Sequence, residues 1–274
     1  MNSESIHVNT TPAPGAKMPA CDIPAPRRGP RSQVIVMGMS RSGTSLTTSI
    51  IAALLRADPN SERRGAEQRG SDGDGAWRGG GPAYPMDTRN PHGYFERKDA
   101  VLLNYKYVQE VSGASWTRFP ANYASHPTLL NFSSPKSAPK RALFEFSARA
   151  ILSDMEKHAP WVLKDVRFAR TLPLWWPLLR EPLCIIPYRH PLEVADSSII
   201  HSVALWENYL TAAIASTRAM RCPTMLVSYS QWLEPAAAAA QFDRLQDFFR
   251  CGQVLINLLV DSPRLPTLWS LNAF

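Results

Sequence analysis

Short apolar runs alternate along the chain with longer segments in which apolar residues recur at helical spacing. Four runs have the length of buried β-strands: VIVMG at 34–38, WVLKD at 161–165, LCIIPY at 183–188 and TMLVSY at 224–229. Helices are predicted at 43–56, 190–220 and 236–249. Because strands alternate with helices, we predict an α/β fold with a mostly parallel central sheet.

Another helix is predicted after a turn marked by Asn90-Pro91 and Gly93. The residues that we expect on its buried face, at helical spacing, are Val101, Leu102, Tyr105 and Val108.

Two segments lack any such periodicity. Residues 1–32 are rich in Pro, Ser and Thr, and we expect them to form a disordered tail. Residues at about 56–85 are rich in Gly, Arg and Asp, and we expect a mobile insertion there. The chain from 33 to 274 is then one domain, and a chain of 274 residues, 45% of them hydrophobic, can bury one sizeable core.

The formal net charge of +7 suits an anionic ligand, although many arginines fall in Pro- or Gly-rich stretches and can equally form a basic fringe. No basic stripe is interleaved with aromatic residues, so we expect no nucleic-acid partner. No apolar run is long enough for a membrane span and no secretory signal is present, so we expect a cytoplasmic protein. The four cysteines are far apart, so we predict neither a zinc site nor a disulfide framework, and Cys184 as a small core residue.

The stretch GMSRSGTS, at 38–45, follows the first apolar run and precedes an apolar helix. Gly38 and Gly43 allow a tight loop whose N–H groups point inward, and the helix adds its positive N-terminal end. Arg41 adds a charge that can bind an oxyanion bidentately. A nucleotide-hydrolysing loop carries Lys where this chain has Thr44, so metal-dependent triphosphate chemistry is disfavoured.

Polar residues also follow the other predicted strands. They are Lys164–Arg167, Arg189 and Ser228–Tyr229. In parallel α/β sheets, ligands bind at the carboxyl ends of the strands, so we expect these residues and the loop to surround one ligand.

The loop resembles the 5′-phosphosulfate loop of sulfotransferases that use 3′-phosphoadenosine 5′-phosphosulfate (PAPS), which implies a three-layer P-loop fold. YRHPLEVADSS at 188–198 is similar to the family's 3′-phosphate element, an Arg and a Ser eight positions apart, and LVSYSQWLEP at 226–235 to the strand end whose aromatic residue packs on adenine. The resemblance implies PAPS-binding roles for Ser40, Arg41, Ser42, Gly43, Thr44, Ser45, Arg189, Ser197 and Tyr229.

Two further segments resemble bacterial carbohydrate-type members of that family: NPHGYFE at 90–96 and WVLKDVR at 161–167. The resemblance implies in-line sulfuryl transfer without a metal, with catalytic candidates Arg41, Glu96, Lys164 and His92. Glu96 is the first candidate for the base, and Lys164 for charge stabilisation. Simpler interpretations also stand: Glu96 as a helix N-terminal acid, Lys164 in a strand-end ion pair, and His92 as a turn residue.

The chain departs from the family at several positions. Gln231 replaces an Asp, Val166 replaces a Pro, and the C-terminal stretch carries no Arg-Lys-Gly element. Two alternatives therefore stay open: a P-loop kinase or nucleotide hydrolase, and a degenerate protein that binds the nucleotide without turnover. The acceptor is expected to be a hydroxyl or amine, for example of a carbohydrate or a small alcohol, and the sequence carries no pattern for its identity or for an oligomeric state.

Overall fold

The computed structural model describes residues 33–57, 95–112, 138–197 and 203–251. The expected tail at 1–32 and nearly all of the expected insertion lie outside these ranges. In chain order the described elements are β1 (Gln33–Val36), α1 (Thr44–Ala57), α3 (Lys98–Ser112), α4 (Ala138–Glu156), β2 (Trp161–Lys164), α5 (Phe168–Trp175), the 3-10 helix η3 (Trp176–Leu178), β3 (Leu183–Tyr188), α6 (Pro191–Ser197), α7 (Val203–Ala219), β4 (Thr224–Ser228), α8 (Tyr229–Trp232) and α9 (Pro235–Cys251).

The four described strands form one sheet in the order β2-β1-β3-β4, and all three pairings are parallel. This arrangement confirms the predicted α/β class with a parallel sheet. In the register of β1, Val36 lies beside Lys164 on one side and Ile185 on the other. The carboxyl ends of the strands therefore share one edge of the sheet, as the sequence predicted.

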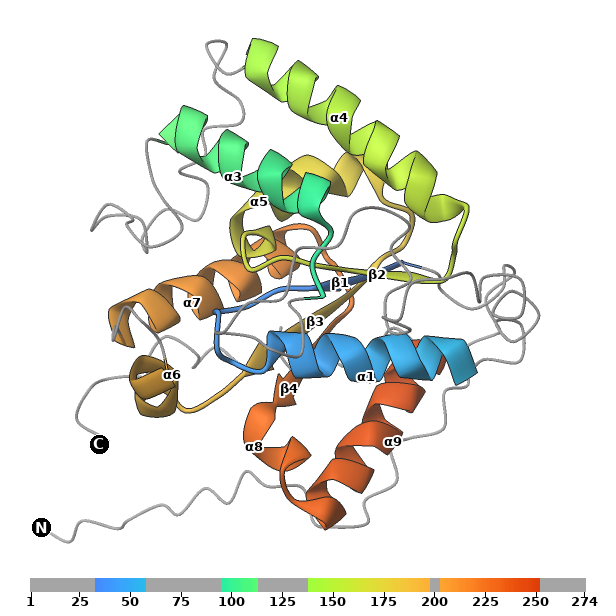
Figure 1. Cartoon of the computed structure of the whole chain (residues 1–274), viewed down its shortest axis with the longest axis vertical. Coiled ribbons are helices and arrows are strands. Elements are labelled where there is room, and N and C mark those ends of the chain that lie inside the picture. The colour runs from blue at the N-terminus through green and yellow to red at the C-terminus, as the bar shows by residue number, and fades with distance from the viewer. Residues whose placement is uncertain (1–32, 58–94, 113–137, 198–202, 252–274) are drawn as a thin grey trace, which may run out of the picture.

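The sheet is covered on both faces, which gives three layers (Figure 1). Val34 and Val36 pack with residues of α1 and α9 in one apolar cluster. Ile35 belongs to the other cluster, with residues of α3, α4, α5 and α7. Strands that are buried on both faces read as continuous apolar runs, which is why these strands were identifiable in the sequence.

The helical layers differ from the sequence prediction in two respects. Helices α4 and α5 were not predicted. Of the 19 residues of α4, the buried ones are Phe144, Ala148, Ile151, Leu152 and Met155. The segment 190–220 forms two helices, α6 and α7, and residues between them lie outside the described ranges. Within the described ranges, no helix has the length and apolar character needed to span a bilayer.

The predicted buried face of α3 was wrong at Leu102, whose exposed fraction is 51%. Val101 and Val108 are buried as predicted, but the centre of the buried face is Asn104, which is fully buried. The Asn104 side chain donates to Asp165 and accepts from Trp175, each at 2.8 Å. Because its polar groups have hydrogen-bond partners, Asn104 can be buried, and the buried face of α3 is centred on a polar residue. The spacing of apolar residues does not indicate such a face.

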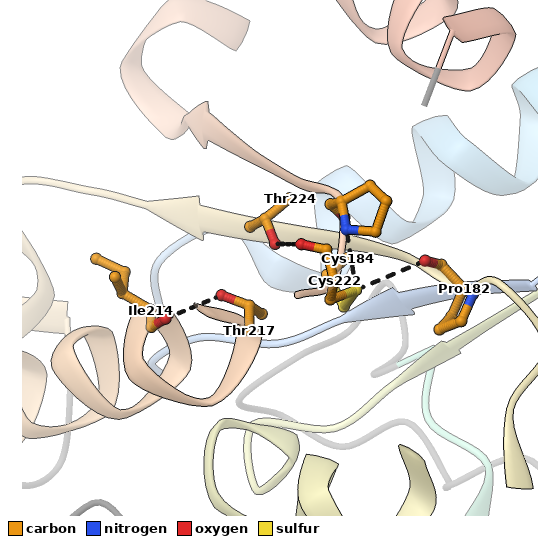
Figure 2. The surroundings of a disulfide bond; sticks show 7 residues. Pro182, Cys184, Ile214, Thr217, Cys222 and Thr224 are labelled. Atoms are coloured by element: carbon orange, nitrogen blue, oxygen red, sulfur yellow. Dashed lines mark hydrogen bonds between the residues drawn. A yellow bond between two sulfur atoms is a disulfide. The ribbon is translucent and has the colours of Figure 1, made fainter. Parts of the chain in front are cut away.

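Cys184 and Cys222 form a disulfide (Figure 2), which corrects the prediction that the cysteines form no disulfide framework. Cys184 lies in β3, is fully buried as predicted, and pairs in register with Thr224 of β4. Cys222 lies in the turn before β4, where its carbonyl accepts a 2.7 Å hydrogen bond from Thr224 Oγ1. The cysteines are 38 residues apart in sequence, and only the pairing of β3 with β4 brings them together.

Candidate functional site

The loop between β1 and α1 is held in an unusual backbone conformation. The φ angles of Gly38, Arg41 and Gly43 are 144°, 69° and 84°. A Cβ added to Gly38 would lie 3.0 Å from the Pro187 carbonyl oxygen, and one added to Gly43 would overlap the ring of Tyr229. The two glycines therefore let the loop lie directly against the ends of β3 and β4. A positive φ is uncommon for a residue that has a side chain, such as Arg41, and backbone strain of this kind clusters at functional sites.

Two hydroxyl groups of this region are buried and have no hydrogen-bond partner in the described part of the chain. They are Ser42 Oγ, in a residue that is 1% exposed, and Thr47 Oγ1, in the first turns of α1. By contrast, Thr48 Oγ1 donates to the Thr44 carbonyl at 2.7 Å. A buried hydroxyl without a partner destabilises a fold by about 1–3 kcal/mol. Ser42 therefore keeps hydrogen-bonding capacity that an oxyanion beside the loop can use.

The side chains of Glu96, Lys164 and Ser45 meet beside the start of α1. Lys164 is the last residue of β2, and its Nζ lies 2.8 Å from Glu96 Oε1 and 3.5 Å from Ser45 Oγ. The side chains of Lys164 and Glu96 are only 3% and 10% exposed. Three residues that were expected in one site thus lie together, although they come from three separate segments.

Burial raises the pKa of Glu96 above its ordinary value of 4.5. The positive charge of Lys164 acts in the opposite direction, and the charge of Asp165 adds to the effect of burial. Desolvation disfavours the charged form of a carboxyl group, while a nearby cation favours it. The Glu96 carboxylate is therefore a stronger base than a solvated one.

Asp165 anchors the end of β2. It is fully buried, accepts from Arg167 Nη1 at 2.8 Å and from Asn104 Nδ2 at 2.8 Å, and its backbone N–H donates to the Val36 carbonyl at 3.2 Å. The Arg167 guanidinium also lies 5.6 Å from the ring centroid of Tyr105. The sequence allows Asp165 to orient either Lys164 or Arg167, and the structure shows the contact with Arg167.

Arg189 follows β3, and two side chains hold it. Its Nε donates to Glu193 Oε2 at 2.6 Å, and its guanidinium carbon lies 4.5 Å from the ring centroid of Tyr229. Ser197 is the last residue of α6, where its Oγ donates to the Val194 carbonyl at 3.2 Å. Arg189 and Tyr229 therefore lie together at the edge of the sheet that also carries the loop.

The remaining candidates are placed less fully. Ser40 is half-buried and Arg41 is exposed in the loop, Thr44 is buried at the start of α1, and His92 lies outside the described residues. Sequence reasoning missed Glu193 and Asn104. Glu193 follows Arg189 at the i+4 spacing of a helical ion pair, a signal that was present in the sequence. Asn104 gave no such signal, because its partners are 61 and 71 residues away.

Comparisons of this chain with protein-family models, with curated proteins and with solved structures found no match.

Proposed function

We propose that this chain is a sulfotransferase that moves the sulfuryl group of PAPS to a hydroxyl or amine of an acceptor, such as a carbohydrate or a small alcohol. The observation that carries the proposal is the position of the Lys164 ammonium between the Glu96 carboxylate and the Ser45 hydroxyl. It combines a buried base, a cation and a hydroxyl donor from the first turn of α1.

The residues around the loop suit the two anionic ends of PAPS. Ser42 has a buried hydroxyl without a partner, and the loop precedes a helix N-terminus, whose partial positive charge favours a phosphosulfate. In the P-loop arrangement that the sequence resembles, Arg41 and Ser45 hold this end. Arg189 and Ser197 are the residues that would hold the 3′-phosphate, since a guanidinium binds phosphate through paired N–H groups.

Bound PAPS supplies an activated sulfuryl group. The oxygen of the acceptor hydroxyl bonds to sulfur while the bond from sulfur to the 5′-phosphate oxygen breaks. In the same step, Glu96 accepts the proton of the acceptor hydroxyl. Once Glu96 is protonated, Lys164 no longer faces a carboxylate, and its charge can stabilise the phosphate oxygen that leaves. A positioned base contributes about 10²–10⁴-fold to the rate. Positioning of the substrates and charge stabilisation supply the remaining rate enhancement.

Ligand-induced thermal stabilisation tests the donor site. We expect adenosine 3′,5′-bisphosphate to raise the unfolding temperature, because a ligand at 100 times its Kd stabilises the fold by about 2.7 kcal/mol. ATP with Mg²⁺ should have a smaller effect. A shift with ATP and Mg²⁺ but none with the bisphosphate would overturn the proposal in favour of a kinase or nucleotide hydrolase.

Turnover tests the chemistry. With PAPS and a panel of carbohydrate and alcohol acceptors, we expect release of adenosine 3′,5′-bisphosphate, and Glu96→Gln should slow it by about 10²–10⁴-fold while keeping the thermal shift. Glu145→Gln is the matched control, since Glu145 is an exposed carboxylate of α4. Binding of the bisphosphate with no turnover for any acceptor would favour the non-catalytic nucleotide-binding alternative.

A further inference from the structure

The orientation of Arg189 is fixed by two contacts of different kinds. Its guanidinium carbon lies 4.5 Å from the centroid of the Tyr229 ring, and its Nε donates to Glu193 at 2.6 Å. The first contact places the guanidinium over the ring, and the second fixes its Nε edge. Within the described ranges, the two Nη groups of Arg189 have no hydrogen-bond partner. Two N–H groups of a planar guanidinium can bind a phosphate as a fork, and the Nη pair is one such combination.

Tyr229 is itself held firmly. It begins α8 directly after Ser228, which pairs in register with Tyr188, the residue before Arg189. The backbone N–H and carbonyl of Ser228 both bond the side chain of Gln241, at 2.8 and 3.0 Å. A Cβ added to Gly43 would meet the Cβ, Cγ and Cδ2 atoms of the Tyr229 side chain, so Gly43 lies directly against this residue. The ring therefore joins the glycine loop to the arginine at the end of β3.

We infer that Tyr229 is a positioning residue that holds Arg189 ready for the 3′-phosphate of the donor, with Glu193 fixing the second edge of the guanidinium. This inference rests on the proposed function. It differs from the family-based expectation that Tyr229 packs on adenine, since the guanidinium of Arg189 already lies over the ring. Tyr229 then discriminates between nucleotides through their 3′-phosphate and contributes little to binding of the base.

A double-mutant comparison with two nucleotides tests the inference. The dissociation constants of adenosine 3′,5′-bisphosphate and adenosine 5′-monophosphate are measured by calorimetry for the wild type, Tyr229→Leu, Arg189→Ala and the double variant. We expect Tyr229→Leu to raise the dissociation constant of the bisphosphate by about 5- to 30-fold, which corresponds to the loss of a partly buried cation–π contact. The dissociation constant of the monophosphate, which lacks the 3′-phosphate, should change by less than about twofold.

Two further results follow if Tyr229 acts through Arg189. Tyr229→Leu should add nothing to the loss caused by Arg189→Ala, because residues that act as one unit are not additive. Tyr229→Phe should bind the bisphosphate as the wild type does, because it keeps the ring. If Tyr229→Leu weakens binding of both nucleotides equally, and its effect adds to that of Arg189→Ala, the tyrosine contacts the adenine and the inference is wrong.

A spectroscopic measurement without nucleotide separates this inference from the proposed function. The Nε–Hε resonance of Arg189, assigned by its loss in Arg189→Ala, should move in Tyr229→Leu because the aromatic ring above it is gone. Tyr105→Leu is the matched control, since Tyr105 lies beside Arg167, and it should move the Arg167 resonance instead. An Arg189 resonance that is unchanged in Tyr229→Leu overturns the inference. If neither nucleotide binds the wild type, the proposed function and the 3′-phosphate role are both overturned, and the spectrum still decides whether Tyr229 holds Arg189.

Discussion

The substitution Lys164→Met tests the buried ion pair most directly. It removes the cation that lies 2.8 Å from Glu96 Oε1 and leaves a carboxyl group that is 10% exposed without that partner. Removing one partner of a buried ion pair destabilises proteins by about 3–5 kcal/mol, because the other charge stays buried. Met keeps the length of the apolar stem, so the change is mainly electrostatic.

Protonation of Glu96 limits the size of this loss. A carboxyl group with an ordinary pKa of 4.5 takes up a proton at pH 7 at a free-energy cost of 1.36 kcal/mol for each of the intervening pH units, about 3 kcal/mol in all. The loss from Lys164→Met at pH 7 is therefore at most about 3 kcal/mol. Of the charged neighbours that remain, Asp165 raises the pKa of Glu96 and Arg167 lowers it.

The pH dependence has a definite sign. Burial already raises the folded-state pKa of Glu96 above 4.5, and loss of Lys164 raises it further. A group with a raised folded-state pKa binds its proton more tightly in the folded protein, so the destabilisation is small near pH 5 and grows as the pH rises. At pH 5 we expect a loss below about 1 kcal/mol.

Urea denaturation of the wild type, Lys164→Met, Glu96→Gln and the double variant, each at pH 5 and pH 7, measures these values. The double variant should regain most of the stability that Lys164→Met loses at pH 7, because neither residue of the pair then carries a charge. An equal loss from Lys164→Met at both pH values, with no recovery in the double variant, would show that the buried charge of Glu96 does not cause the loss.

Three further outcomes are expected. Replacing Cys184 and Cys222 together with Ala should lower the free energy of unfolding in urea by about 4 kcal/mol, because the disulfide closes a loop across 38 residues of sequence. Gly43→Ala should lower the unfolding temperature and weaken binding of the bisphosphate. The added Cβ would overlap the Tyr229 ring, and a φ of 84° is strained for alanine. Asp165→Ala should lower the free energy of unfolding by about 3–5 kcal/mol, because it leaves buried donors unpaired.

Each of these outcomes has a control that can contradict it. A reducing agent should destabilise the wild type and leave the variant that lacks Cys184 and Cys222 unchanged, and an equal effect on both proteins would argue against the disulfide. Ser49→Ala on α1 should bind the bisphosphate as the wild type does, since the Ser49 hydroxyl donates to the Leu46 carbonyl within its own helix. Glu145→Ala breaks an exposed i,i+4 pair with Arg149 and should cost less than about 0.5 kcal/mol. If Asp165→Ala lowered the free energy of unfolding by as little as Glu145→Ala does, burial would add nothing to the interactions of Asp165.

The strands were predictable because each is a short apolar run buried on both faces, and β3 matched its predicted bounds of 183–188. The glycine loop was predictable because Gly38 and Gly43 adopt positive φ angles that other residues rarely adopt. Helix α4 was not predicted, although the sequence carries a start signal for it: Ser137 directly precedes its first residue, and Pro139 lies in its first turn.

The sequence by itself determined the local part of the site: an apolar strand, a glycine loop with its hydroxyl groups, and polar residues after each strand. These depend on backbone geometry and on patterns within a few residues. Only the tertiary structure decided the pairings, because Glu96 and Lys164 are 68 residues apart and the two cysteines 38 apart. It also placed Arg189 over Tyr229 and buried Asn104 at the centre of a helix face. Such contacts depend on how parallel strands align at the sheet edge, which no spacing along the chain specifies.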